Sequence, residues 1–298
     1  MFDPAPCATR RRALLALGGA CILPCAHAST PVFVMQNEPH LRHARALVFA
    51  ALDAAGLRAR FSDAPLGNEQ RNVHQISSGL THLDMMPATP KRLELVREGK
   101  LRMIPIPLDR GLLGWRVNLL LQSRRDMLAQ VRGAGDLAQF TMGQNVGWMD
   151  TAIYRAAGIP VKEIKTWSNG EFTEQMEAGF LDLFPLGLEE TLSYFLAHFQ
   201  RRYPQLTTDP HILMRYPWFR FAWLAPGAST AALHDALQQG FDRIVANGSF
   251  VRVWQKHRKI PPPSVLRGRV PIDIPNPFYD NTLVPARYRH LLAQPARS

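Results

Sequence analysis

The chain has 298 residues, which is long enough for one or two domains with a sizeable core. Its three cysteines are Cys7, Cys21 and Cys25, so the chain beyond them can form no disulfide, zinc–thiolate site or thiol nucleophile. The formal net charge of +11 would suit an anionic partner, but the Lys and Arg residues are scattered and accompany no recognition motif, so we expect no nucleic-acid binding.

The N-terminus has the three parts of a secretory signal. Arg10–Arg12 form a positive region, Ala13–Ala26 is apolar but too short to span a bilayer, and Ala26-His27-Ala28 offers small residues at a cleavage site. Thr9-Arg10-Arg11 also resembles a twin-arginine signal, so the export route stays open between Sec and Tat. We predict that residues 1–28 are a signal peptide and that the mature protein is periplasmic.

Short apolar runs alternate with amphipathic segments after residue 28, as is typical of an α/β protein. Residues 41–55 place apolar side chains at i, i+3 and i+4 and stop at Gly56, which predicts a helix. Thr89 and Pro90 open another helix, with Thr89 as its N-cap. In chain order we expect strands at 31–35, 59–61, 83–86, 101–106 and 116–121, and helices at 41–55, 68–78 and 90–98.

A second α/β set follows, with strands expected at 140–142, 163–166 and 183–186 and helices at 150–157, 171–178 and 188–198. A strand pair at 212–216 and 219–224 precedes a helix whose cap is expected to be Ser229. The proline-rich tail from Pro261 has no periodicity and is expected to lie extended over the surface. No stretch is apolar for long enough to form a transmembrane helix.

The order of these elements resembles that of the type II periplasmic solute-binding proteins, which include amino-acid receptors of ABC transporters. The most specific matches are Leu83–Arg92, which is similar to a strand with Asp followed by a Thr-Pro-x-Arg helix start, and Asp242–His257, with Gly248-Ser249-Phe250 between two helices. A poorly characterised branch of this superfamily is similar at three further segments, Ile104–Arg116, Gly143–Thr151 and Asn276-Pro277.

The resemblance implies an α/β, two-lobed periplasmic-binding-protein type II fold, in which each lobe is a mixed sheet flanked by helices and a two-strand hinge joins the lobes. Lobe 1 would comprise residues 29–113 and 217–298, including the tail, and lobe 2 residues 114–216. A small-molecule ligand would bind between the lobes, which close by hinge bending. The expected protein is a monomer, is not embedded in a membrane, and has an inner-membrane ABC permease or a sensor as its partner.

The resemblance also implies ligand-binding residues in lobe 1. Arg92 stands at the position where amino-acid receptors clamp the ligand carboxylate, a task that suits a planar guanidinium. The alternative is an exposed helix arginine paired with Glu94 or Glu98. Thr89 could contribute its hydroxyl or its amide at the same helix start, and this role is compatible with that of an N-cap.

In lobe 2, residues 147–151 stand where the family presents a helix N-terminus to the ligand. Thr151 would offer a hydroxyl, and Trp148 a stacking or apolar wall unless it is simply packed at the surface. Asp150 is expected to cap the helix and could repel an anion. The family's aspartate for the ligand amino group corresponds to about Gly187, so Glu190 or Glu189 would have to replace it, which puts an α-amino-acid ligand in doubt.

The ten histidines show no metal-ligand spacing, and the chain has no Walker A loop, dinucleotide fingerprint or Gly-x-Ser-x-Gly elbow, so we expect no metal or cofactor. The leading hypothesis is therefore a binding protein without catalytic residues, for a small polar and perhaps carboxylate-bearing solute. The alternative is a periplasmic enzyme on the same fold, such as a cyclohexadienyl or arogenate-type dehydratase. That activity needs a general acid, for which Glu189, Glu190 and Asp84 are the candidates.

Overall fold

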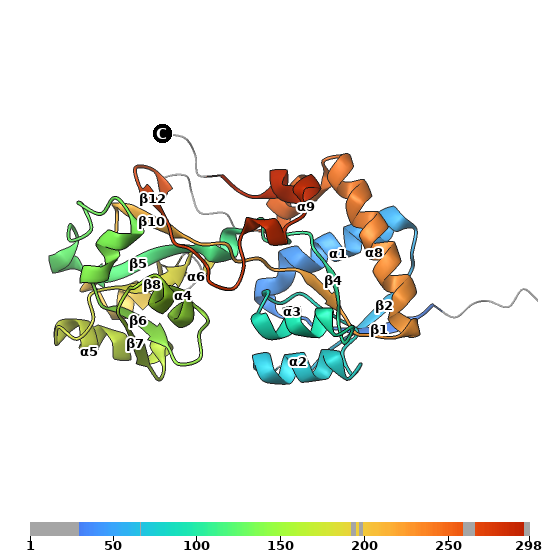
Figure 1. The fold of residues 1–298 in the computed structure, drawn as a ribbon, viewed down its shortest axis with the longest axis horizontal. Helices are drawn as coiled ribbons and strands as arrows, with labels where there is room; N and C mark the ends of the chain where they lie inside the picture. Colours follow the sequence, from blue (N-terminus) through green and yellow to red (C-terminus); the bar gives the residue numbers. More distant parts are fainter. Residues whose placement is uncertain (1–29, 66, 192–194, 197–198, 259–265, 295–298) are drawn as a thin grey trace, which may run out of the picture. The chain divides into compact units, whose positions relative to one another are not determined.

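The first sheet of the protein, seen in a computed structural model, has five strands in the order β2-β1-β3-β11-β4 (Figure 1). β1 (Val32–Met35) pairs in parallel with β2 (Arg60–Asp63) and β3 (Leu83–Asp84). β11 (Ala222–Leu224) runs antiparallel between β3 and β4 (Arg102–Ile104). The sheet thus combines strands from the beginning of the chain with one from beyond residue 220.

Two groups of helices accompany this sheet. α1 (Arg42–Ala55), α8 (Ala228–Ala246) and α9 (Ser249–His257) pack against one another, whereas α2 (Glu69–Ser77) and α3 (Pro90–Arg97) lie beside each other and apart from that group (Figure 1). α1 and α8 come so close that a Cβ atom on Gly240 would lie 1.9 Å from the carbonyl oxygen of Ala51, so only glycine allows this contact.

Helix ends show where local signals are informative. α1 ends at Gly56 in the left-handed conformation, and the side chains of Asn68 and Thr89 accept hydrogen bonds from the third residues of α2 and α3, which confirms the predicted stops and caps. The two other predicted caps are wrong. The N-cap of α8 is Gly227 rather than Ser229, and the N-cap of α4 is Met149 rather than Asp150, in both cases without a side-chain hydrogen bond.

The second sheet is centred on β5 (Trp115–Leu121) and has the order β12-β10-β5-β8. β5 pairs antiparallel with β8 (Phe184–Gly187), with β10 (Ile212–Arg215) and, at its other end, with β9 (Leu206–Thr208), which the sequence did not predict. The other elements of this half are a parallel pair, β6 (Met142–Asn145) and β7 (Val161–Ile164), and the helices α4 (Asp150–Ala156), α5 (Glu171–Glu177), α6 (Leu188–Glu190) and α7 (Gln200–Arg202).

The chain crosses between the two sheets at residues 105–114 and 216–221. These crossing segments contact each other: the amide of Leu108 donates to the carbonyl of Arg220, and that of Tyr216 to the carbonyl of Gly114. The predicted strand pair at 212–216 and 219–224 is therefore wrong. Its first half pairs within the second sheet and its second half within the first, because the crossing occurs between them.

The C-terminal tail adds β12 (Val270–Asp273) to the second sheet, parallel to β10. It then contacts the surroundings of the first sheet, where the hydroxyl of Tyr279 donates to the carbonyl of Ala88. The sequence predicted an extended tail on lobe 1 without a strand. Pro271 concealed the strand, because proline is excluded from central strands but is tolerated at a sheet edge, which is where β12 lies. The lobe boundaries stay a prediction.

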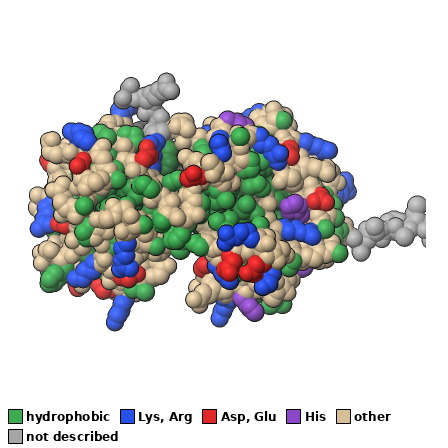
Figure 2. Space-filling model, in the orientation of Figure 1, with side chains coloured by type: hydrophobic (Ala, Val, Ile, Leu, Met, Phe, Trp, Pro, Cys, Tyr) green, Lys and Arg blue, Asp and Glu red, His purple; other side chains and the backbone are tan. Residues whose placement is uncertain are grey.

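The structure describes residues 30–65, 67–191, 195–196, 199–258 and 266–294. The predicted signal peptide and most of the later part of the predicted helix 188–198 lie outside these ranges. Within them, no helix is both long and apolar enough to cross a bilayer. Lys and Arg side chains are scattered among other residues over the face shown in Figure 2 rather than gathered in one large patch.

Candidate functional site

A cavity of about 920 Å³ is bounded by residues from the surroundings of both sheets. Its volume lies within the range of small-molecule sites. Apolar side chains such as Leu112, Trp148 and Trp218 form part of the wall. The charged residues that line it are Arg42, Glu69, Arg116, Asp150, Glu190, Arg220, Lys256 and Arg258, together with the histidines His40, His43 and His257.

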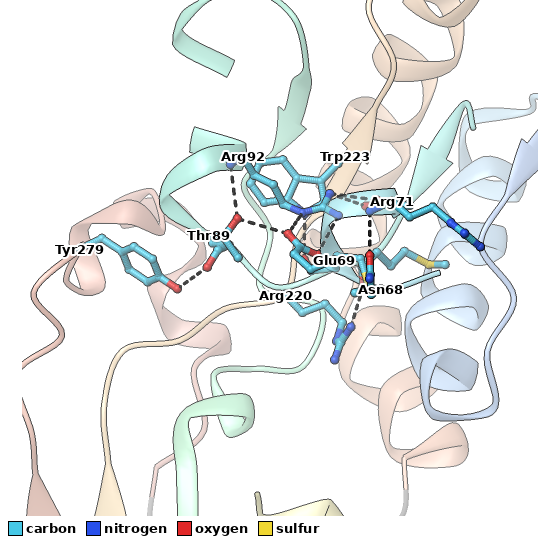
Figure 3. Close-up of polar contacts among 12 residues, drawn as sticks. Asn68, Glu69, Arg71, Thr89, Arg92, Arg220, Trp223 and Tyr279 are labelled. Carbon is cyan, nitrogen blue, oxygen red and sulfur yellow. Dashed lines mark hydrogen bonds and ion pairs between the residues drawn. The ribbon is translucent and has the colours of Figure 1, made fainter. Parts of the chain in front are cut away.

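Arg92, the predicted carboxylate clamp, is engaged with two protein carboxylates (Figure 3). Its Nη1 donates to both oxygens of Asp84 at 3.0 and 2.9 Å. Nε and Nη2 donate to the two oxygens of Glu69 at 2.9 and 3.3 Å. The guanidinium also lies 5.5 Å from the ring centre of Trp223. Its side chain is 0% exposed and does not line the cavity, so its role as a ligand clamp stays a prediction.

The alternative pairing expected for Arg92, with Glu94 or Glu98, is not the one found, because both carboxylates that it contacts come from other elements. Asp84 ends β3 and Glu69 begins α2. Burial raises the pKa of Asp84 to about 6, although the charge of Arg92 acts in the opposite direction. The network ties β3, α2 and α3 together, and removing one member of a buried pair typically costs about 3–5 kcal/mol.

Thr89 lies at the junction of this network and the cavity. Its hydroxyl accepts from the amide of Arg92 at 3.3 Å, as the N-cap of α3, and donates to Glu69 at 3.3 Å. Thr89 and Glu69 both line the cavity. Glu69 is therefore an accessible carboxylate that is held in place from behind by Arg92, a feature that the sequence did not reveal because α2 and α3 are joined only in the fold.

Asp150 lines the cavity but is paired with Arg116 of β5 instead of capping α4. Nε of Arg116 donates to Asp150 at 2.7 Å, and the hydroxyl of Tyr216 donates to the same carboxylate oxygen. The guanidinium lies 5.1 Å from the ring centre of Tyr216 and 5.2 Å from that of Trp218. All of these groups are buried, and the charge of Asp150 raises the pKa of Arg116 against the effect of burial.

The remaining predicted residues of the second half differ in position. Trp148 lines the cavity and packs in an aromatic cluster, with its ring centre 6.1 Å from Trp167 and 6.2 Å from Phe184. Glu190 also lines it and accepts from the amide of Gly187 at 2.9 Å. Thr151 is buried and is not among the lining residues.

A group of basic residues that the sequence did not single out lines the cavity near the start of α1 and the end of α9. Arg220, from the second crossing segment, is 7% exposed, and Arg258, after α9, is 9% exposed. Burial and the charges of these two arginines lower the pKa of His40 to about 4 and that of His43 to about 2. Both histidines are therefore neutral at pH 7.

No protein-family model matches this sequence, and no curated protein matches it. The chain is similar in structure to the ligand-binding core of GluR0 in complex with L-glutamate, with a TM-score of 0.50 and 9% identity over 78% of this chain and 99% of that one.

Two further solved structures are similar at lower scores. An ancestral arginine-binding protein bound to arginine has a TM-score of 0.49 and 12% identity, and covers 76% of this chain and 98% of its own. The arginine-, lysine-, histidine-binding protein ArtJ from Geobacillus stearothermophilus has 0.47 and 14%, over 78% of this chain and 96% of its own. Identities this low bear on the fold alone. The chain has the two-lobed fold of the type II periplasmic solute-binding proteins, as the sequence predicted.

Proposed function

We propose that the protein is an exported receptor that binds a small polar, carboxylate-bearing solute in this cavity and delivers it to an ABC-type transporter or a sensor. The observation that carries the proposal is the cavity itself. It is large enough for a small solute and is lined by residues from both sides of the crossing segments. A solute held there would contact both lobes, so binding would favour closure about the two crossing segments.

The lining favours a solute with an acidic group. Five cationic side chains face the cavity against three carboxylates. One of the cations, Arg116, is matched by Asp150, and Glu190 is bound to a backbone amide. Trp148 and Trp218 supply apolar walls, which suits an organic solute better than a bare inorganic ion.

A thermal-shift screen of the mature protein tests this proposal. Amino acids, organic acids and sugars would be compared, and a cognate solute at about 100 times its Kd should add about 2.7 kcal/mol to the free energy of unfolding. For a chain of this size each kcal/mol raises Tm by about 2–4 °C. We expect an acidic solute to give a shift of this order. If no member of the panel changes Tm, the receptor proposal fails.

The same screen separates the receptor from the dehydratase alternative. A dehydratase needs a general acid in the cavity. Asp84 is buried against Arg92 and does not line the cavity, whereas Glu190 does. The side chain of Glu189 lies outside those that the structure describes. Prephenate and arogenate belong in the panel for this reason, and turnover of either one would favour the enzyme over the receptor.

We also propose that residues 1–28 direct export and are then removed. The protein recovered from the periplasm should have the mass of a chain that begins at Ser29. The double substitution Arg10→Lys with Arg11→Lys keeps the positive charge, so it should block export only if the route is Tat. A protein that stays in the cytoplasm with its first 28 residues would contradict the proposal.

A further inference from the structure

We propose that the acidic group of the solute binds at the first turn of α1, between Arg220 and Arg258, rather than at Arg92. This inference rests on the proposed function and makes it more specific: the group is a carboxylate or phosphate oxyanion, and its subsite lies at the α1–α9 end of the cavity.

The first turn of α1 is arranged for an anion. The helix has 14 residues, and its N-cap, Leu41, makes no side-chain hydrogen bond to the exposed amides. These amides and the helix dipole attract negative charge. Yet the first turn contains no acidic residue, and Arg42 occupies its first position, where a cation is unfavourable. Because Arg42 and His43 also line the cavity, an oxyanion bound there would offset this repulsion.

Arg220 and Arg258 reach the same end of the cavity from other segments. Both guanidinium groups belong to nearly buried residues that line the cavity, and a guanidinium can bind a carboxylate or a phosphate through two parallel hydrogen bonds. Asp109 is buried close enough for both arginines to lower its pKa, against the effect of burial, but it does not line the cavity. One carboxylate beside two guanidinium groups leaves this end positively charged.

His43 provides an independent observation. The residue is 2% exposed and lines the cavity, and its Nε2 is buried with no hydrogen-bond partner among the described residues. A buried polar atom in this state is rare, and it indicates a missing partner. Since the imidazole is neutral at pH 7, its Nε2 can carry the proton and donate it to an oxyanion.

The position of Arg92 excludes it from the same task without a rearrangement. Its guanidinium already serves Asp84 and Glu69, and a ligand carboxylate would have to displace one of them. Arg220 lies beside this network but points away from it (Figure 3), and its Nη1 donates to the carbonyl of Met85 at 2.7 Å. The two arginines therefore face different surroundings, although both lie near the end of β3.

Inorganic phosphate and succinate are suitable probes, because they present the two oxyanions with little else. Thermal shift and calorimetry would compare the mature protein with Arg258→Gln and with Arg97→Gln, whose exposed side chain lies at the end of α3 outside the cavity. We expect at least one probe to bind the parent protein and Arg97→Gln equally. Its affinity for Arg258→Gln should be at least about tenfold lower, as for the loss of a charged hydrogen bond.

Arg42→Glu guards against a folding defect in Arg258→Gln, because Arg42 is exposed at the rim of the cavity. It should also weaken the probe, by charge reversal at the helix start. If neither probe binds the parent protein while a neutral solute does, the receptor proposal stands and the oxyanion subsite is wrong. Equal binding by all four proteins, or loss of binding in Arg92→Gln alone, would overturn the subsite as well.

Discussion

Replacing Arg92 by glutamine should lower the free energy of unfolding by about 3–5 kcal/mol at pH 8. The substitution leaves the buried carboxylate of Asp84 without its partner and frees Glu69, so β3, α2 and α3 lose the network that joins them. Urea unfolding followed by circular dichroism measures the change. Lys91→Gln is the matched control, since it breaks only the exposed pair with Glu94 on the same helix and should have little effect.

The effect of Arg92→Gln should depend on pH. Burial already raises the pKa of Asp84 to about 6, and the loss of Arg92 raises it further. Between about pH 4 and this raised value, the folded protein binds a proton that the unfolded chain does not, so stability falls as the pH rises. The deficit of the variant should therefore be smallest near pH 4 and largest at pH 8. A deficit that is independent of pH would show that Asp84 is not the group left unpaired.

Replacing Arg116 by methionine should also cost about 3–5 kcal/mol, because it leaves the buried Asp150 with Tyr216 as its remaining partner. The same unfolding measurement applies. Arg155→Met is the control within α4, because its partner Glu163 lies 3.3 Å away in a largely exposed pair. The additional substitution Asp150→Asn should recover part of the stability by removing the unpaired charge. If Asp150→Asn made the variant still less stable, the pair could not be the cause.

Much of the first sheet and its helices could be predicted from the sequence because their signals are local. Gly56, Asn68 and Thr89 mark helix ends by their own backbone or side-chain chemistry. The partners of the strands were not local. β10 and β11 read as one pair although the chain changes sheets between them, and β9 and β12 are too short to show alternation.

The site was predicted only in part for the same reason. Thr89, Trp148, Asp150 and Glu190 line the cavity, whereas Arg92 and Thr151 do not. Position in a motif indicated which loops approach the cavity but not how each charge is paired. Arg116 left one signal, a cation within an apolar strand, which only a buried partner can satisfy. The cations at 42, 220 and 258 come from segments far apart in the chain, so no sequence pattern joins them.

The edge position of β12 has a consequence for the behaviour of the protein in solution. Its four residues pair with Ile212–Arg215, so the tail covers the outer edge of β10. A chain cut before Val270 would expose that edge, with a row of amide and carbonyl groups able to pair with a strand of a second molecule. The tail thus protects the folded protein against self-association through open strands, a protection that any shortened version would lack.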